Sequence, residues 1–128
     1  MNLLLDTQLV LWATGQPDKL SAKARRLLLD GENQLVFSAA SLWEISIKSA
    51  LGRVDFKVDT RRLWRLLLVH GYRELPVSGE HAIAVETLPT LHKDPFDRML
   101  VAQARAEGLL LLTTDKRVAA YGEAVRKV

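Results

Sequence analysis

Two aspartates follow short apolar runs, where a carboxylate could take part in metal-dependent chemistry. Asp6 ends the run Leu3–Leu5, and Asp115 comes two threonines after the run Leu109–Leu112. In open parallel sheets, ligands bind outside the carboxyl ends of the strands, so both acids are expected at the edge where chemistry occurs. An aspartate after a strand can also simply begin a turn or cap the next helix. For either residue alone, this structural alternative stays open.

Glu44 and Asp97 also have structural explanations. Glu44 can pair with Lys48 one helical turn later, a surface contact worth about 0.2–0.5 kcal/mol. Asp94, a proline and Asp97 form a well-defined helix start, with acids at the cap and at the third position. An acid at that third position also projects forward from the helix N-terminus, and a helix that begins near the sheet edge would bring it close to Asp6. We therefore expect Asp94 to act chiefly as a cap and Asp97 chiefly as a ligand.

Several carboxylates gathered in one pocket would raise each other's pKa unless a cation compensates their charge. Hard oxygen ligands favour Mg²⁺ or Mn²⁺. Such an ion lowers the pKa of a bound water and stabilises the negative charge that develops on a phosphate. Zinc fits poorly, because the chain has no cysteine and because His70, His81 and His92 show no ligand spacing. The lack of cysteine also excludes disulfides and a cysteine nucleophile.

The elements that would position these acids alternate between short apolar runs and longer segments with helical spacing. This is the pattern of βα units, so the fold class is α/β with a central, mostly parallel sheet. Strands are expected at Leu3–Leu5, Leu35–Phe37, Arg73–Val77, Leu109–Leu112 and, as a possible edge strand, Ala124–Val128.

The expected helices have clear start and stop signals. Serine or aspartate caps open four of them, at Ser21, Ser41, Ser78 and Asp94, and glycine or proline ends them. A fifth helix covers Thr60–His70, where leucine and tryptophan recur at three and four residues. Single helical turns are expected at Leu9–Ala13 and after Asp115.

Composition indicates one domain over residues 1–128, because 48% of the 128 residues are hydrophobic and no linker-like run interrupts them. The apolar runs are far shorter than the ~20 residues that span a bilayer, and Asp6 interrupts the first run, so no secretory signal is expected. We expect a cytoplasmic protein without membrane contact. The net charge of +3 favours a polyanionic partner, although this signal is weak by itself.

Four ordered blocks of the chain, nearly end to end, resemble PIN-domain ribonucleases, specifically the VapC-like toxins of bacterial type II toxin–antitoxin pairs. The blocks are Leu4–Thr7 with Leu11–Trp12, Ser38–Lys48, His92–Ala104 and Leu112–Asp115. Two departures are visible: Gln8 stands where many relatives have His, and the segment after Asp115 lacks the Phe often found there, with Val118 nearby instead. Neither departure removes a carboxylate.

The resemblance implies a three-layer α/β/α domain that hydrolyses RNA with Mg²⁺ or Mn²⁺. It makes Asp6, Glu44, Asp97 and Asp115 the catalytic, metal-binding quartet, with Asp6 and Asp97 as the chief ligands. It places Asp94, Thr113 and Thr7 beside them, with the Thr113 hydroxyl as a hydrogen-bond partner inside the pocket. Four basic neighbours could hold flanking RNA phosphates or could be solvated surface charges: Lys93, Arg98, Lys116 and Arg117.

The resemblance also implies a homodimer restrained by a cognate antitoxin whose tail covers the acidic pocket. One alternative is a catalytically silent PIN-like binding module, which the intact quartet disfavours. Another is a Mg²⁺-binding phosphoacceptor receiver domain, but receivers need adjacent acids after the first strand, and here Thr7 and Gln8 follow Asp6. An oxidoreductase is disfavoured because no glycine fingerprint follows any strand.

Overall fold

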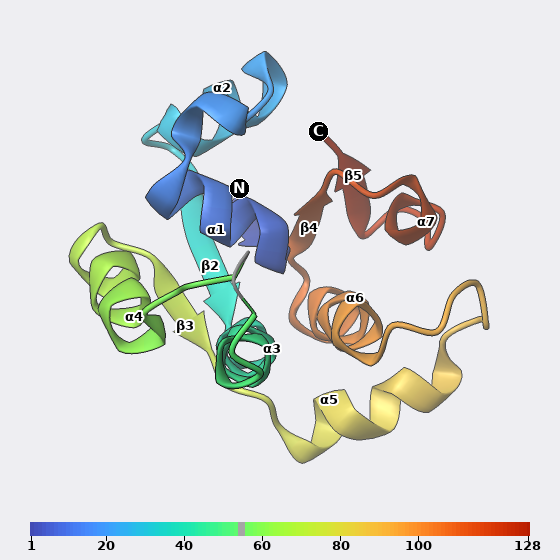
Figure 1. Cartoon of the computed structure of the whole chain (residues 1–128). Coiled ribbons are helices and arrows are strands. Elements are labelled where there is room, and N and C mark those ends of the chain that lie inside the picture. Colours follow the sequence, from blue (N-terminus) through green and yellow to red (C-terminus); the bar gives the residue numbers. More distant parts are fainter. Residues whose placement is uncertain (54–55) are drawn as a thin grey trace.

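The computed structural model describes residues 1–53 and 56–128. Its described strands form one sheet, in which neighbouring strands run parallel. Five strands are described, in the order β3-β2-β1-β4-β5. They are β1 (Asn2–Leu5), β2 (Gln34–Ser38), β3 (Arg73–Leu75), β4 (Leu110–Thr113) and β5 (Val125–Lys127). The predicted parallel α/β class is confirmed, and so is the edge strand near the C-terminus (Figure 1).

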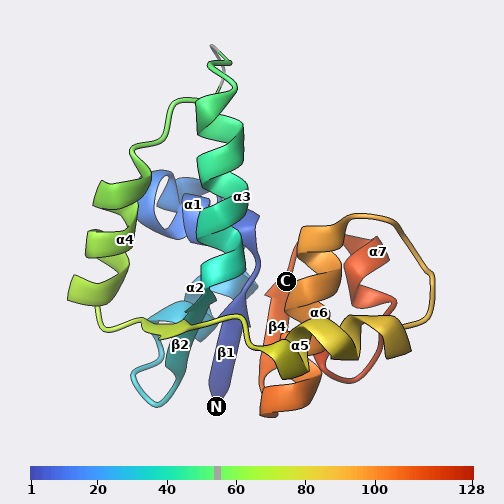
Figure 2. The ribbon, with the colours of Figure 1, turned by 90° about the horizontal axis from the view of Figure 1, so that it is seen from below.

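Seven α-helices are described in the same residues. They are α1 (Thr7–Gly15), α2 (Ala22–Leu29), α3 (Ala39–Ala50), α4 (Thr60–Val69), α5 (Gly79–Ala84), α6 (Pro95–Glu107) and α7 (Lys116–Ala119). Short 3-10 turns cover Pro17–Lys19 and Val85–Thr87. Helices α1 to α4 supply the core on one face of the sheet, and α5, α6 and α7 supply the core on the other. Figure 2 shows α1 and α4 to the left of the strands and α5, α6 and α7 to the right. The expected three-layer α/β/α arrangement is therefore confirmed.

Each face of the sheet has its own apolar core, because successive side chains of a strand point to opposite faces. In β1, Leu4 packs against α6 and α7 residues such as Leu100 and Val118. Its neighbours Leu3 and Leu5 belong to the second core, which α1, α2, α3 and α4 cover. All three leucines are fully buried, so β1 is held rigidly on both sides.

The expected cap of the second long helix was wrong. Helix α3 begins directly after β2, and the Ser38 hydroxyl caps it by accepting a hydrogen bond from Ala40 N. Ser41 lies inside the helix instead, where its buried hydroxyl accepts a hydrogen bond from Thr7 at 2.9 Å. A serine at the end of a strand satisfies the first helical N–H groups, so no separate loop is needed before α3.

Smaller differences concern element lengths. Helix α1 is longer than the single turn expected at Leu9–Ala13. Strand β3 ends at Leu75, before Pro76, because proline has no N–H to donate to a neighbouring strand. Helix α5 ends at Ala84, and a 3-10 turn completes the predicted segment toward Leu88.

The sheet order creates a switch point between β1 and β4. From β1 the chain proceeds to β2 and β3 on one side, and β4 and β5 occupy the other side. Such a point leaves a crevice at the carboxyl ends of the strands, where α/β proteins bind ligands. In the described part of the chain, no helix has both the length and the apolarity to span a lipid bilayer.

Candidate active site

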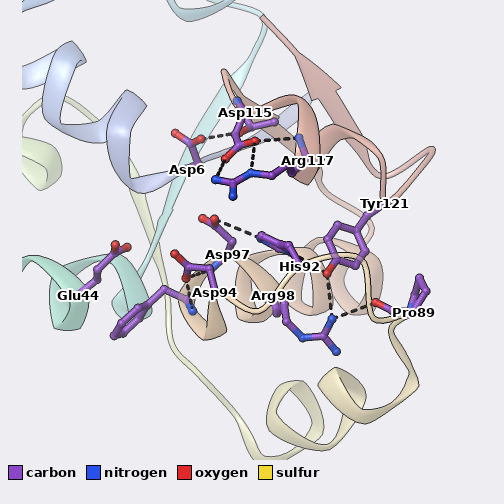
Figure 3. Close-up of polar contacts among 12 residues, drawn as sticks. Asp6, Glu44, Pro89, His92, Asp94, Asp97, Arg98, Asp115, Arg117 and Tyr121 are labelled. Carbon is purple, nitrogen blue, oxygen red and sulfur yellow. Dashed lines mark hydrogen bonds and ion pairs between the residues drawn. The ribbon is translucent and has the colours of Figure 1, made fainter.

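An acidic cavity of about 290 Å³ opens at the carboxyl ends of β1 and β4. All four acids of the proposed quartet line it: Asp6, Glu44, Asp97 and Asp115. Thr7, Asp94 and Arg117 lie on its wall as well. Four separate stretches of sequence therefore meet in one depression, with the acids arranged around it as Figure 3 shows.

Asp6 is the most buried of the four acids, with 6% of its surface exposed. It follows β1 and caps α1, since its Oδ1 accepts a hydrogen bond from Leu9 N at 2.9 Å. Its Oδ2 accepts a hydrogen bond from the buried Thr113 hydroxyl at 2.7 Å. The resemblance implied a hydrogen-bonding role for this hydroxyl inside the pocket but did not name its partner. Burial raises the pKa of Asp6 despite these hydrogen bonds, and Glu44 adds a smaller repulsion.

Asp97 lies in the first turn of α6, and the cap of that helix confirms the sequence interpretation. Asp94 Oδ1 accepts hydrogen bonds from the backbone N–H groups of Phe96 and Asp97 at 2.9 and 3.1 Å. Burial raises the pKa of Asp97 to about 6, and the negative charges of Asp94, Asp6 and Glu44 add to the effect. A hydrogen bond from His92 acts in the opposite direction.

Glu44 lines the cavity and also forms the ion pair that the sequence offered as an alternative. It is 7% exposed and lies in the second turn of α3, because that helix begins at Ala39. Its Oε2 also accepts a hydrogen bond from Lys48 Nζ at 2.7 Å, and Lys48 lines the same cavity. The ion pair anticipated as an alternative is therefore part of the site.

Asp115 both caps α7 and forms an ion pair with Arg117. It opens α7 by accepting a hydrogen bond from Arg117 N at 2.8 Å, and its Oδ2 lies 3.0 Å from Arg117 Nη2. These contacts with Arg117 hold the pKa of Asp115 below its usual value. The backbone N–H of Asp115 donates to Thr113 Oγ1 at 3.1 Å, so one threonine connects Asp115 with Asp6.

The donor chemistry of the cavity fits a hard divalent cation, although no ready-made ligand cluster is present. Among residues 1–53 and 56–128, no three His, Asp or Glu side chains stand close enough together to hold a metal ion. Burial chiefly, and neighbouring carboxylates to a lesser degree, raise the pKa values of Asp6 and Asp97, so the ionised forms of these two acids are poorly stabilised without a cation. The other two are paired with cations of their own helices. Oxygen donors of this kind select Mg²⁺ or Mn²⁺.

The four basic residues expected near RNA have different surroundings. Arg117 lines the cavity, and Lys116 is exposed at the start of α7. Lys93 borders a separate, mostly apolar cavity of about 660 Å³ between α3, α5 and α6. Arg98 borders that same cavity and donates hydrogen bonds to the carbonyl oxygens of Pro89 and Val85 and to the Tyr121 hydroxyl. Its role as an RNA contact stays a prediction that this placement does not favour.

Sequence reasoning missed Lys48, which lines the cavity, and also His92 and Tyr121, which connect with Asp97 outside its wall. Lys48 was treated only as a surface partner of Glu44, and His92 only as an unsuitable zinc ligand. In the structure, His92 Nε2 lies 3.4 Å from Asp97 Oδ2, and its Nδ1 lies 2.8 Å from the Tyr121 hydroxyl. The position of His92 two residues before Asp94 could have suggested a contact with this helix start. No sequence signal connects it with Tyr121, which lies 29 residues later.

A larger groove adjoins the acidic cavity. It has a volume of about 690 Å³, lies between α1 and α4, and shares Gln8, Leu11 and Phe56 with the cavity. Its wall combines apolar side chains such as Trp12 and Leu66 with basic ones.

Comparison with known proteins gives consistent matches over nearly the whole chain. The family model described as PIN domain matches residues 3–124. A relative named ribonuclease VapC22, from Mycobacterium tuberculosis, is 25% identical over 121 residues, which cover 94% of this chain and 92% of the relative.

Two solved structures illustrate the similarity in fold. One is VapBC2 from Rickettsia felis bound to a promoter DNA fragment, with a TM-score of 0.73 and 14% identity, covering 100% of this chain and 99% of the other. The other is VapC20 from Mycobacterium tuberculosis, described as a toxin that cleaves the sarcin-ricin loop. It has a TM-score of 0.60 and 18% identity, covering 94% of this chain and 95% of the other.

Proposed function

The chain belongs to the PIN domain family, and from this premise we propose that it is a divalent-metal-dependent endoribonuclease acting as the toxin of a toxin–antitoxin pair. The observation that carries the proposal is the cavity of about 290 Å³ lined by Asp6, Glu44, Asp97 and Asp115. The ribonuclease name of the VapC22 relative and the RNA-cleaving description of VapC20 support RNA as the substrate.

Asp6 and Asp97 are the proposed chief ligands of Mg²⁺ or Mn²⁺, with Glu44 and Asp115 as further carboxylates. The chemistry that such an ion supplies when bound is activation of a water and neutralisation of phosphate charge. Asp6 is held by two hydrogen bonds, one to the α1 backbone and one to Thr113, so its position is fixed before substrate arrives. Pre-positioned charges of this kind avoid reorganisation during the reaction.

Lys48 and Arg117 are the basic residues best placed to hold the RNA backbone beside the cut. Both line the acidic cavity, and they come from different elements, α3 and α7. Each is paired with a carboxylate of the quartet, at 2.7 Å for Lys48 and 3.0 Å for Arg117. Neutralisation of those carboxylates by a cation would release both side chains toward phosphates, where each contact contributes to salt-dependent binding.

The test of the activity is cleavage of RNA by the purified protein with Mg²⁺ or Mn²⁺ and with EDTA. Asp6→Asn should lower cleavage at least ~100-fold without unfolding the protein, because asparagine caps a helix about as well as aspartate. Asp18→Asn, on the exposed turn after α1, is the matched control that removes an exposed carboxylate outside the cavity. Full activity of Asp6→Asn, or undiminished cleavage in EDTA, would contradict the proposal.

The toxin role includes a cognate antitoxin and a homodimer as proposed partners. It is supported by the toxin–antitoxin complexes among similar structures, such as VapBC2 of Rickettsia felis. The groove between α1 and α4 gives an antitoxin segment a path to the acidic cavity. Expression of the chain alone should arrest bacterial growth, and co-expression with its antitoxin should restore it.

The groove assignment has its own test. Leu66→Glu places a charge in the groove wall outside the acidic cavity, so it should abolish antitoxin binding and leave RNA cleavage within about twofold of the parent. Size-exclusion chromatography of the two proteins together measures the complex. Unchanged antitoxin binding by this variant would exclude the groove as the antitoxin site.

A further inference from the structure

A chain of polar contacts links the loop after α5 with Asp97. Arg98 Nη1 donates hydrogen bonds to the Pro89 carbonyl oxygen at 2.9 Å and to the Tyr121 hydroxyl at 2.9 Å. His92 Nδ1 lies 2.8 Å from the same hydroxyl. On the other side of the ring, His92 Nε2 lies 3.4 Å from Asp97 Oδ2, at the long end of a hydrogen bond (Figure 3).

The donors and acceptors along this chain favour one direction. A guanidinium can only donate, so the Tyr121 oxygen accepts from Arg98. The Tyr121 hydrogen is then satisfied when it points to His92 Nδ1 and Nδ1 accepts it, because an Nδ1–H would give the hydroxyl oxygen two donors and leave its own hydrogen without this partner. A neutral imidazole that accepts at Nδ1 carries its hydrogen on Nε2, and that N–H faces the Asp97 carboxylate. The opposite tautomer would direct the Nε2 lone pair at an ionised carboxylate oxygen.

The surroundings of His92 leave its ring little freedom. The His92 side chain is 6% exposed, and Tyr121 is 4% exposed within the core between the sheet and α6. The two rings pack edge to face with centroids 5.3 Å apart. The Arg98 guanidinium carbon lies 6.0 Å from the centre of the Tyr121 ring, which adds a cation–π contact. Since Tyr121 both packs on the imidazole and hydrogen-bonds to it, and Arg98 in turn holds Tyr121, the orientation of the His92 ring is set before any ligand binds.

We propose that His92 is a positioning residue for Asp97, held in the Nε2–H tautomer by Tyr121 and Arg98, so that Asp97 keeps one oxygen on His92 and presents the other to a divalent cation. This inference rests on the proposed metal-dependent function. Partners of this kind, one contact behind the ligand, typically change metal affinity by about 10- to 100-fold when they are lost. Arg98 thereby acquires a structural role instead of an RNA contact.

The tautomer is tested first, in the metal-free protein. Two-bond ¹H–¹⁵N correlation spectra distinguish protonated from unprotonated ring nitrogens, and we expect His92 to carry its hydrogen on Nε2 when the ring is neutral. In Tyr121→Phe the hydrogen bond that fixes Nδ1 as an acceptor is lost, so the spectrum should show a mixture of tautomers. A parent spectrum dominated by the Nδ1–H form would overturn the proposal. So would a Tyr121→Phe spectrum identical to that of the parent.

Binding of Mn²⁺ alone, measured by calorimetry, tests the consequence without any RNA. His92→Phe keeps a ring but removes the N–H, and should weaken Mn²⁺ binding about 10- to 100-fold. His92→Gln keeps an N–H near the Nε2 position and should retain affinity within about fivefold of the parent, a factor of the size of one modest hydrogen bond. A role in packing alone predicts the reverse order, with phenylalanine better tolerated than glutamine.

Matched controls are available elsewhere in the chain. His70→Phe removes an exposed imidazole on the other side of the sheet, and Tyr72→Phe removes the other phenolic hydroxyl, so neither should change Mn²⁺ affinity. If His92→Phe does not fold, Tyr121→Phe, with an expected loss of about fivefold, replaces it. If the parent protein binds Mn²⁺ and every His92 and Tyr121 variant binds it equally well, this inference is refuted and the proposed function is not. Parent protein that binds no Mn²⁺ refutes the proposed function as well.

Discussion

Replacement of Asp97 by asparagine should stabilise the metal-free protein while removing its metal binding. The pKa of Asp97 rises from 3.8 to about 6 in the fold, because the carboxylate is buried beside Asp94 and, more weakly, Asp6 and Glu44. The folded protein therefore binds more protons than the unfolded chain between these two values. Stability then falls as pH rises from about 4 to about 6 and stays at the lower level above that.

The magnitude follows from the two pKa values. At about 1.4 kcal/mol for each pKa unit, ionised Asp97 costs the fold about 3 kcal/mol. Its side chain is 22% exposed, so solvent screening reduces this figure, and we expect about 1–2 kcal/mol. Asparagine has no charge to bury and still offers an oxygen to His92. The Asp97→Asn variant should thus melt about 4–8 °C higher than the parent at pH 7.5 in EDTA.

The assay is thermal and urea unfolding of parent and variant at several pH values between 4.5 and 7.5. The advantage of asparagine should grow up to about pH 6.5 and then stay constant, whereas the control Asp18→Asn should show no such rise. Excess Mg²⁺ should reverse the order, because only the parent gains stability from a bound ion. A variant less stable than the parent at pH 7.5, or an advantage independent of pH, would refute the reasoning.

Two further predictions concern the supports of the site. Gln103 is fully buried and accepts a hydrogen bond from the Ser38 hydroxyl at 2.6 Å, while its amide nitrogen lies 3.3 Å from both the Pro76 carbonyl oxygen and His81 Nδ1. Gln103→Leu should lower the free energy of unfolding in urea by about 1–3 kcal/mol, because it leaves these buried groups without their partner. An unchanged free energy of unfolding would show that they find other partners. Arg117→Ala removes the ion-pair partner of Asp115, so Mn²⁺ affinity in calorimetry should rise about twofold or more. RNA binding should weaken, and the slope of its logarithmic affinity against logarithmic salt concentration should fall by about one. Weaker Mn²⁺ binding would contradict the competition between Arg117 and the cation for Asp115.

Apolar runs, helical spacing and cap residues predicted most of the fold, because these patterns depend on structure that is local in the sequence. The run Leu3–Leu5 is buried on both faces of the sheet, and an uninterrupted apolar run indicates that environment. Cap residues located α2, α5 and α6, since side-chain caps act within three residues of the helix start. The same logic misplaced the start of α3, because Ser38 and Ser41 are both chemically suitable caps and only the end of β2 decides between them.

The sequence singled out the four acids that line the cavity, but it could not predict their pKa values. Strand ends supported Asp6 and Asp115, while Glu44 and Asp97 depended on the resemblance to a known family. A pKa depends on burial and on charges distant in sequence, so the raised value of Asp97 and the lowered one of Asp115 required the tertiary structure.

The surroundings of Asp97 show most clearly what only the tertiary structure decided. The sequence placed Asp97 correctly at the start of a helix, because a cap and a proline are local signals. It could not pair His92 with Tyr121 or direct Arg98 away from the cavity, because those contacts form only when α6 packs against the segment after α7. Local chemistry thus determined which carboxylates are available, and packing between distant segments determined how they are held.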